Sequence, residues 1–272
     1  MIEHDSQDIV VLGLPYDRNS SYLRGTALAP ARIREALFSE SANMWTENGI
    51  DLGEMAGWQF SADLTLDDPQ AAFGQIERKI ANLLDQNSQV ISLGGDHSIT
   101  YPIIRAYRRH FSDLSILQLD AHPDLYDVLD GNRLSHACPF ARIMEEKLVQ
   151  RLVQVGIRTL TGHQRQQADR FGVEIIEMRA IDKVDQLNFT GPVYLSLDMD
   201  CLDPAFAPGT GTPVVGGLST SRVLRILQGI ADLNIVGFDL VEVAPAYDQA
   251  QVTALAGASL ALQFLYMRAS RG

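Results

Sequence analysis

Short apolar runs built largely of Val, Ile and Leu recur along the chain, and they restrict its fold more than any other feature. Several runs are nearly continuous in apolar residues and do not alternate with polar ones, which is typical of parallel strands buried on both faces of a sheet. The runs predict strands at Ile9–Leu14, Gln89–Leu93, Ser115–Leu119, Leu152–Ile157, Val173–Ile176, Val193–Leu197 and Ile235–Val241.

Segments with helical spacing of apolar residues, or with residues that favour a helix start, lie between these runs. They are 30–37, with Pro30 in the first turn, 76–84, 223–233, with Ser219 or Thr220 as a cap, and about 252–268. Proline suits the first turn of a helix because its missing N–H is not needed there. The alternation of strands and helices predicts an α/β fold, in which helices cover both faces of a mostly parallel sheet.

The length and composition are those of an ordinary globular protein. The 272 residues contain no low-complexity linker and no fixed-period repeat, so we expect one continuous domain over residues 1–272. Hydrophobic residues make up 46% of the chain and charged residues 21%, which excludes a disordered or collagen-like protein.

The charge balance restricts the partners. Lys and Arg number 22 against 34 Asp and Glu, for a net charge of −12. An acidic chain without a basic cluster is not expected to bind nucleic acid, whereas it would attract a cationic small molecule. No apolar stretch has the length of a membrane helix, and the acidic start lacks the basic region of a signal peptide. With only two cysteines, no disulfide framework is implied, so we expect a cytoplasmic protein. The lack of a membrane-length apolar stretch predicts that it has no membrane partner.

Acidic and imidazole side chains follow four of the predicted strands. The segments that carry them are Gly94–Ser98, Asp120–Asp124, Asp198–Pro204 and Glu242. In parallel sheets, ligands bind beyond the carboxyl ends of the strands. We therefore expect these side chains to collect at one edge of the sheet.

The spacing within two of these segments indicates metal ligands. Asp120, His122 and Asp124 alternate along the chain, and Asp198 and Asp200 repeat that spacing. Alternate residues of an extended segment point to the same side, so these side chains are expected to converge with His97. Burying four carboxylates together is very unfavourable without cations.

Two divalent cations would balance the four negative charges, and such a pair can activate one water molecule. Oxygen-rich ligation with one imidazole per metal favours Mn²⁺, although Co, Ni and Zn would also bind such a set.

Other polar residues near these segments have simpler interpretations. Asp96 and Asp203 are expected to stabilise turns or to support ligands, and His110 and His163 to lie at the surface or to bind backbone groups. Met199 is expected to point into the core. Cys201 is expected to act as a small buried hydrophobe. Cys138 has the same interpretation, with a role beside His136 as the alternative.

The three strand-end motifs resemble those of the ureohydrolase superfamily, which includes arginase, agmatinase, guanidinobutyrase and formiminoglutamase. The matching motifs are GGDHS at 94–98, DAHPD at 120–124 and DMDCLDP at 198–204, and the likeness extends from Gly13 to the last predicted helix. The segment 135–140 resembles the histidine loop of the family, and Glu242 its substrate-binding glutamate. The resemblance implies an arginase-like, three-layer α/β/α fold and two Mn²⁺ ions per subunit.

The resemblance also assigns individual ligands. Carried over by position, it implies that His97 and Asp124 bind one metal ion, while His122 and Asp200 bind the other. Asp120 and Asp198 would bridge the two ions.

The substrate is indicated by finer features of the resemblance. The segment Val241–Asp248 and Tyr126 resemble bacterial agmatinases. In contrast, 19–23 and Tyr126 together with 135–137 resemble plant-type arginases, which are themselves closer to agmatinases, and Ala137-Cys138 replaces the Gly-Thr usual in agmatinases. The balance favours agmatine, with arginine or a guanidino acid such as 4-guanidinobutyrate as alternatives.

The resulting hypothesis is a binuclear manganese amidinohydrolase that converts agmatine into urea and putrescine, a step of polyamine biosynthesis. Glu242 would pair with the guanidinium group, which His136 and Tyr126 would also contact. Asp124 would carry a proton to the leaving amine. His136 would shuttle protons, because its unperturbed pKa lies near neutrality.

Two other classes of protein fit the sequence less well. A non-catalytic descendant used for assembly or sensing would be expected to have lost ligands, whereas all six are present. A binuclear phosphoesterase would be expected to carry a Gly-rich phosphate loop or an arginine cluster. The resemblance further implies a homo-oligomer, either a trimer or a hexamer.

Overall fold

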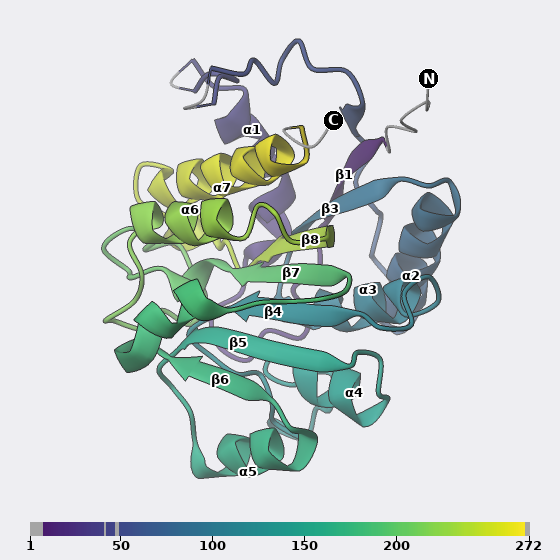
Figure 1. Cartoon of the computed structure of the whole chain (residues 1–272), viewed down its shortest axis with the longest axis vertical. Coiled ribbons are helices and arrows are strands. Elements are labelled where there is room, and N and C mark those ends of the chain that lie inside the picture. Colours follow the sequence, from purple (N-terminus) through teal and green to yellow (C-terminus); the bar gives the residue numbers. More distant parts are fainter. Residues whose placement is uncertain (1–7, 41, 47–48, 270–272) are drawn as a thin grey trace.

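The computed structural model describes residues 8–40, 42–46 and 49–269, so the acidic N-terminus lies outside the described part. Figure 1 shows three layers, with a central sheet between two layers of helices. The described residues form the strands β1 (Ile9–Leu14), β2 (Trp58–Phe60), β3 (Gln89–Gly94), β4 (Ser115–Leu119), β5 (Arg151–Ile157), β6 (Glu174–Glu177), β7 (Val193–Asp198) and β8 (Ile235–Val241). The predicted α/β/α architecture is confirmed.

All strand pairings in this sheet are parallel, and the order is β2-β1-β3-β8-β7-β4-β5-β6. The seven predicted strands are present with ends displaced by one residue at most. The sequence analysis missed β2, which has only three residues and pairs with β1 at the edge of the sheet. A strand this short, and not fully buried, leaves no apolar run to detect.

The helices follow the strands and cover both faces of the sheet. They are α1 (Ala29–Leu37), α2 (Pro69–Asp85), α3 (Thr100–Tyr107), α4 (Pro139–Glu145), α5 (Gly162–Phe171), α6 (Thr220–Gly229) and α7 (Val252–Ala269). The predicted cap of α6 is correct, because the Ser219 side chain accepts a hydrogen bond from the backbone N–H of Arg222. The helix ends at Gly229, before the predicted 233, and α2 begins at Pro69, seven residues before its first periodic residue.

Neighbouring residues of each buried strand serve two different cores, one on each face of the sheet. In β4, Leu117 belongs to the core that α1, α6 and α7 cover, whereas Ile116 belongs to the core that α2, α3, α4 and α5 cover. This division follows from the two-residue period of a strand, whose successive side chains point to opposite faces. It explains why the strands read as continuous apolar runs.

The motif-bearing strands are neighbours in the centre of the sheet. The four strands β3, β8, β7 and β4 are adjacent in that order. Because all of them run in the same direction, the segments that follow them emerge at one edge. The topology alone therefore brings together residues that lie up to 145 positions apart, such as His97 and Glu242.

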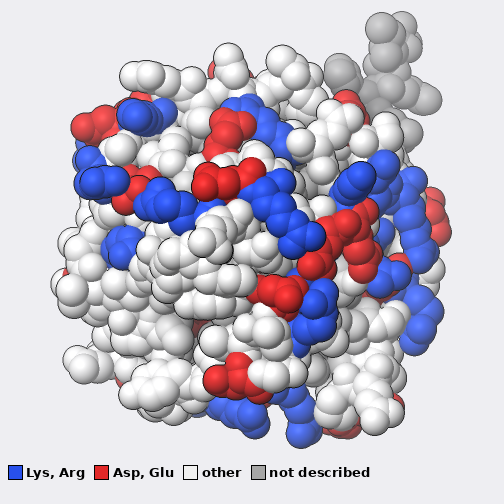
Figure 2. Space-filling model, turned by 90° about the horizontal axis from the view of Figure 1, so that it is seen from below, with Lys and Arg blue, Asp and Glu red and all other residues white. Residues whose placement is uncertain are grey.

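Charged side chains of both signs lie interspersed on the surface, as the face in Figure 2 shows. Arg133, for example, pairs with Asp127 at 2.7 Å and with Glu145 at 3.0 Å. Exposed pairs of this kind each contribute roughly 0–1 kcal/mol to stability. Within the described part of the chain, no helix has the length and apolar character required to cross a membrane.

The core should be sensitive to the loss of one ring. Phe238 of β8 and Phe264 of α7 are fully buried and stacked, with ring centroids 4.7 Å apart. We expect Phe238→Ala to lower the free energy of unfolding by about 3–5 kcal/mol, because it leaves a cavity. Urea denaturation would measure the change. Phe206→Ala is the control, since Phe206 is 43% exposed, and its effect should stay within about 0.5 kcal/mol. Equal effects would contradict the assigned core.

Candidate metal centre

The His97 segment turns sharply at the end of β3. A Cβ atom on Gly95 would lie 1.7 Å from the carbonyl oxygen of Tyr16, so only glycine fits there. The Asp96 carboxylate then accepts a hydrogen bond from the backbone N–H of Ser98, which caps the short 3₁₀ helix His97–Ile99. This turn directs the His97 imidazole toward the segments that follow β4 and β7.

Four of the predicted ligands meet at one imidazole nitrogen. His97 Nδ1 lies 3.1 Å from an Oδ2 atom of each of Asp120, Asp124 and Asp198. All four side chains are at least nine-tenths buried. The ligand atoms of His97, Asp120 and Asp124 are close enough together to hold one metal ion.

The other predicted ligands form a second group beside the first. His122 Nδ1 lies 2.9 Å from Asp200 Oδ2 and 3.7 Å from Asp120 Oδ1. Asp120, His122 and Asp200 could also hold a metal ion. Asp120 is common to both groups, with one carboxylate oxygen near His97 and the other near His122.

The ligands converge by a different local conformation from the predicted one. Residues 120–124 do not form an extended segment, and Asp124 has a left-handed φ of 48°. The segment curls because Asp120 Oδ1 accepts the backbone N–H of His122 at 2.6 Å. Likewise, Asp200 lies in a 3₁₀ turn, where its N–H donates to Asp198 Oδ1. The alternation of Asp and His in the sequence therefore correctly predicted that these side chains converge, but the extended backbone conformation that it implied is wrong.

The electrostatics of the two groups suit cations. Burial, together with the charge of Asp120, raises the pKa of Asp124 to about 6. Burial and the charge of Asp200 raise the pKa of Asp198 well above its usual value. His97 Nδ1 is buried and has no hydrogen-bond partner of suitable geometry among the described residues, although three carboxylates surround it. Divalent cations would relieve the repulsion and use this nitrogen, so the donor set fits a pair of metal ions.

Glu242, after β8, lies next to these groups and binds His136. Glu242 Oε1 accepts the backbone N–H of His97 at 2.9 Å and lies 2.7 Å from His136 Nδ1. Its other oxygen, Oε2, is buried without a hydrogen-bond partner in the described residues. The backbone at Glu242 is left-handed, with φ of 66°, and its N–H donates to the Gly95 carbonyl oxygen.

Ser21 holds the other side of the His136 ring. In the neutral form of the ring, the Ser21 backbone N–H donates to His136 Nε2 at 3.1 Å, and the Ser21 hydroxyl lies 2.8 Å from the same nitrogen. Burial disfavours protonation of the imidazole, but the Glu242 carboxylate outweighs it and raises the pKa of His136 to about 9. Ser21 is exposed, so His136 Nε2 lies on the solvent side of the ring and Nδ1 on the side of Glu242.

Tyr126 lies apart from this pair. Its ring stacks on His163 with centroids 5.7 Å apart, and its backbone N–H donates to the Ala137 carbonyl oxygen. No described contact joins its side chain to His136 or Glu242. His163 also accepts the N–H of Asp127, so it both lies at the surface and binds the backbone, as expected.

Several supporting residues escaped the sequence analysis. Gln118 Nε2 donates to Asp120 Oδ2 at 2.7 Å, and Gln154 Nε2 donates to Gln118 Oε1 at 2.6 Å. Both glutamines are fully buried inside strands. Ser196 and Asp239 are buried in the same way. The available signal was a polar residue within an otherwise apolar run, since such a residue must find partners on burial.

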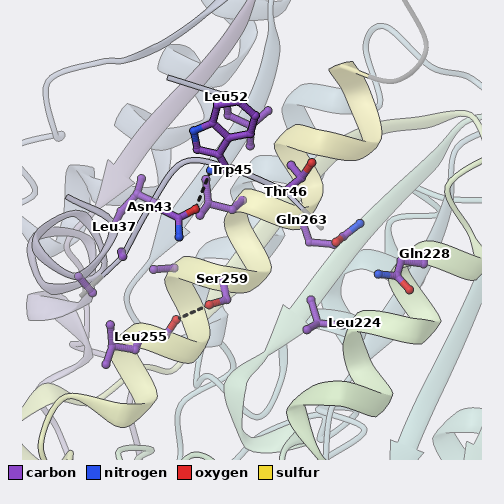
Figure 3. Close-up of a pocket in the computed structure, with 14 residues that line it drawn as sticks. Leu37, Asn43, Trp45, Thr46, Leu52, Leu224, Gln228, Leu255, Ser259 and Gln263 are labelled. Carbon is purple, nitrogen blue, oxygen red and sulfur yellow. Dashed lines mark hydrogen bonds between the residues drawn. The ribbon is translucent and has the colours of Figure 1, made fainter. Parts of the chain in front are cut away.

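A separate hollow lies between α1, α6, α7 and residues 42–46 (Figure 3). Its volume is about 340 Å³, and apolar side chains line it together with Asn43, Gln228, Ser259 and Gln263. Among the described residues that line it, none is titratable and none belongs to the two ligand groups. The metal centre is therefore the stronger candidate for chemistry.

The chain is similar to known proteins over nearly its whole length. The model of the arginase family matches residues 7–267. An agmatinase of Neisseria meningitidis serogroup A is 39% identical over 286 residues, covering 97% of this chain and 88% of the relative. The structure of an arginase from Medicago truncatula has a TM-score of 0.88 at 36% identity, covering 97% of this chain and 87% of that one. A hypothetical agmatinase from Burkholderia thailandensis has a TM-score of 0.89 at 32% identity, covering 98% and 88%.

Both thiols should be unreactive in the folded protein. Cys138 and Cys201 are fully buried, and burial raises the pKa of Cys138 to about 12. Because the thiolate is the reactive form, we expect neither cysteine to react with Ellman's reagent within minutes at pH 8. Two thiols per chain should react after denaturation. Rapid reaction of one thiol in the folded protein would contradict this and would restore a role for Cys138 beside His136.

Proposed function

Because the chain belongs to the arginase family, we propose that it is an amidine hydrolase that converts agmatine into urea and putrescine. The observation that carries this function is the pair of ligand groups that share Asp120. Next to them, a buried carboxylate oxygen of Glu242 has no partner. The agmatinases among the relatives support agmatine as the substrate.

Two Mn²⁺ ions per subunit fit the oxygen-rich donor set best. His97 and Asp124 would hold one ion, His122 and Asp200 would hold the other, and Asp120 and Asp198 would be shared between them. When bound, the cations supply Lewis acidity and activate a water molecule as the nucleophile. The convergence of two imidazoles and four carboxylates from three strand ends supports this assignment.

Glu242 binds and orients the substrate. Its Oε2 atom accepts a hydrogen bond from the guanidinium group, a charge-assisted contact that gains strength in a buried site. Its Oε1 atom is already held by the backbone of His97 and by the ring of His136. The free oxygen is therefore fixed in place before the substrate arrives.

The reaction adds water across a C–N bond of the guanidinium group. The water oxygen bonds to the central carbon, the bond from that carbon to the alkyl nitrogen breaks, and putrescine leaves after gaining a proton. Asp124 carries that proton to the leaving amine. His136 exchanges protons with solvent through Nε2, where the Ser21 hydroxyl lies 2.8 Å away.

The remaining features of the protein are consistent with a small cationic substrate. The net charge of −12 favours the approach of agmatine, which carries two positive charges. Tyr126 is also assigned a contact with the substrate on its resemblance to agmatinases, although its ring stacks on His163 and not on His136. The chain works as a single domain in the cytoplasm, in a homo-oligomer of three or six subunits, and serves polyamine biosynthesis without a nucleic-acid or membrane partner.

Arginine is the second candidate substrate, favoured by the similarity to a plant arginase. Arginine and 4-guanidinobutyrate both carry a carboxylate, which an acidic protein repels. We therefore expect kcat/KM for agmatine to exceed the values for the other two substrates at least about tenfold, or 1.4 kcal/mol. A coupled urea assay on the manganese-loaded protein measures all three. Turnover of arginine with no turnover of agmatine would overturn this choice.

Replacing Glu242 by Gln keeps the shape of the side chain and removes its charge. Loss of a buried, hydrogen-bonded charge partner costs about 2–5 kcal/mol, so kcat/KM for agmatine should fall roughly 30-fold to several thousand-fold. Manganese content should stay unchanged, since Glu242 is not a ligand. The matched control is Glu35→Gln, an exposed glutamate of α1, which should leave kcat/KM intact. A loss of less than threefold in Glu242→Gln would argue against the substrate-binding role.

A further inference from the structure

A buried chain of hydrogen bonds leads from His97 into the middle of the sheet. His97 Nε2 lies 2.9 Å from the hydroxyl of Ser196 in β7. That hydroxyl donates to Asp239 Oδ1 in the neighbouring strand β8 at 2.7 Å. All three residues have 0% exposure. Nothing in the proposed reaction uses Ser196 or Asp239, although both lie inside strands that are otherwise apolar.

We propose that Ser196 and Asp239 are positioning residues that fix the His97 ring for metal binding. The proposal rests on the proposed function, because it takes His97 as a metal ligand. It concerns two residues that touch neither the substrate nor the metal ions and that act only through His97.

The donor and the acceptor of each hydrogen bond on this path follow from counting protons. A serine hydroxyl has one proton, and Ser196 donates it to Asp239. The contact between Ser196 Oγ and His97 Nε2 therefore requires that the nitrogen donate its own proton. With the Nε2 proton directed at Ser196, Nδ1 is the ring nitrogen left to bind a metal ion, and it is the atom that faces Asp120, Asp124 and Asp198.

Asp239 is held as an acceptor by every partner it has in the described structure. Its Oδ2 atom accepts hydrogen bonds from Thr100 Oγ1 at 2.9 Å and from the Tyr194 hydroxyl at 3.0 Å. Three donors therefore surround this carboxylate, and one of them is Ser196. Burial raises the pKa of the Asp239 carboxyl, and its three donors oppose that shift by stabilising the anion. The negative charge of Asp239 keeps the Ser196 proton in this hydrogen bond, so Ser196 Oγ is left as the acceptor for His97 Nε2.

The arrangement is the kind that tunes a metal ligand. A histidine that donates its second ring proton to a carboxylate, directly or through a hydroxyl, has a fixed orientation and a more basic free nitrogen. Edge-on contact with Phe140, at 5.2 Å between ring centroids, restrains the same imidazole from the side. The ring is therefore oriented before a metal ion arrives.

Manganese affinity tests this role independently of catalysis. Full-length, metal-free protein is titrated with Mn²⁺ by calorimetry. Loss of such a supporting partner typically weakens metal affinity about 10–100-fold. We expect that loss in at least one of the two binding steps of Ser196→Ala, which removes the acceptor for His97. Asp239→Asn should weaken manganese binding to a similar extent, because an amide in either orientation lacks the charge that holds the Ser196 proton.

Thr100→Val is the matched control. It also deletes one hydrogen bond to Asp239 in the same buried site, but it leaves the path from His97 to Asp239 intact. A purely structural role predicts equal effects of Ser196→Ala and Thr100→Val on manganese affinity and on the Tm of the metal-free protein. The positioning role predicts similar changes in Tm, with both manganese steps of Thr100→Val within about threefold of wild type.

Each outcome of the titration is decisive. Equal loss of affinity in Ser196→Ala and Thr100→Val overturns the positioning role while leaving the metal site in place. Folded wild-type protein that binds no Mn²⁺ overturns the proposed function itself, and the positioning role with it. If Ser196→Ala does not fold, Asp239→Asn against Thr100→Val makes the same comparison.

Discussion

Repulsion among buried carboxylates is the constraint around which this protein is organised. Asp120, Asp124, Asp198 and Asp200 lie buried within one small region at the ends of central strands. Burying like charges together is among the most unfavourable arrangements in a protein interior. The two imidazoles offset only part of this charge. A pair of divalent cations would balance the negative charge. The repulsion that is unfavourable without metal therefore favours the binding of divalent cations.

Around this region, the fold supplies polar support in an apolar sheet. Gln118 and Gln154 lie behind Asp120, while Ser196 and Asp239 lie behind His97. Each supporting group comes from inside a strand, where hydrogen bonds along the sheet fix the backbone. Precise placement of a ligand is easier from such rigid elements than from loops. The site is thus supported by the central strands of the sheet, although its ligands lie just beyond the strand ends.

The sequence predicted the layers, the parallel sheet and most strand boundaries, because buried parallel strands have a strong and simple pattern. It also predicted which residues would converge, since parallel strands that end in Asp and His must bring them to one edge. It did not predict the curled backbone at Asp124, because side-chain capture of backbone N–H groups has no periodic signature. Nor did it reveal Ser21 as a partner of His136, which depends on the path of a loop through space.

The metal centre is tested most directly by a crystal structure of the manganese-loaded protein with anomalous diffraction data at the manganese absorption edge. We expect two anomalous peaks on either side of Asp120, one next to His97 and Asp124 and the other next to His122 and Asp200. Peaks elsewhere, or no peak among these carboxylates in protein that releases urea, would contradict this expectation.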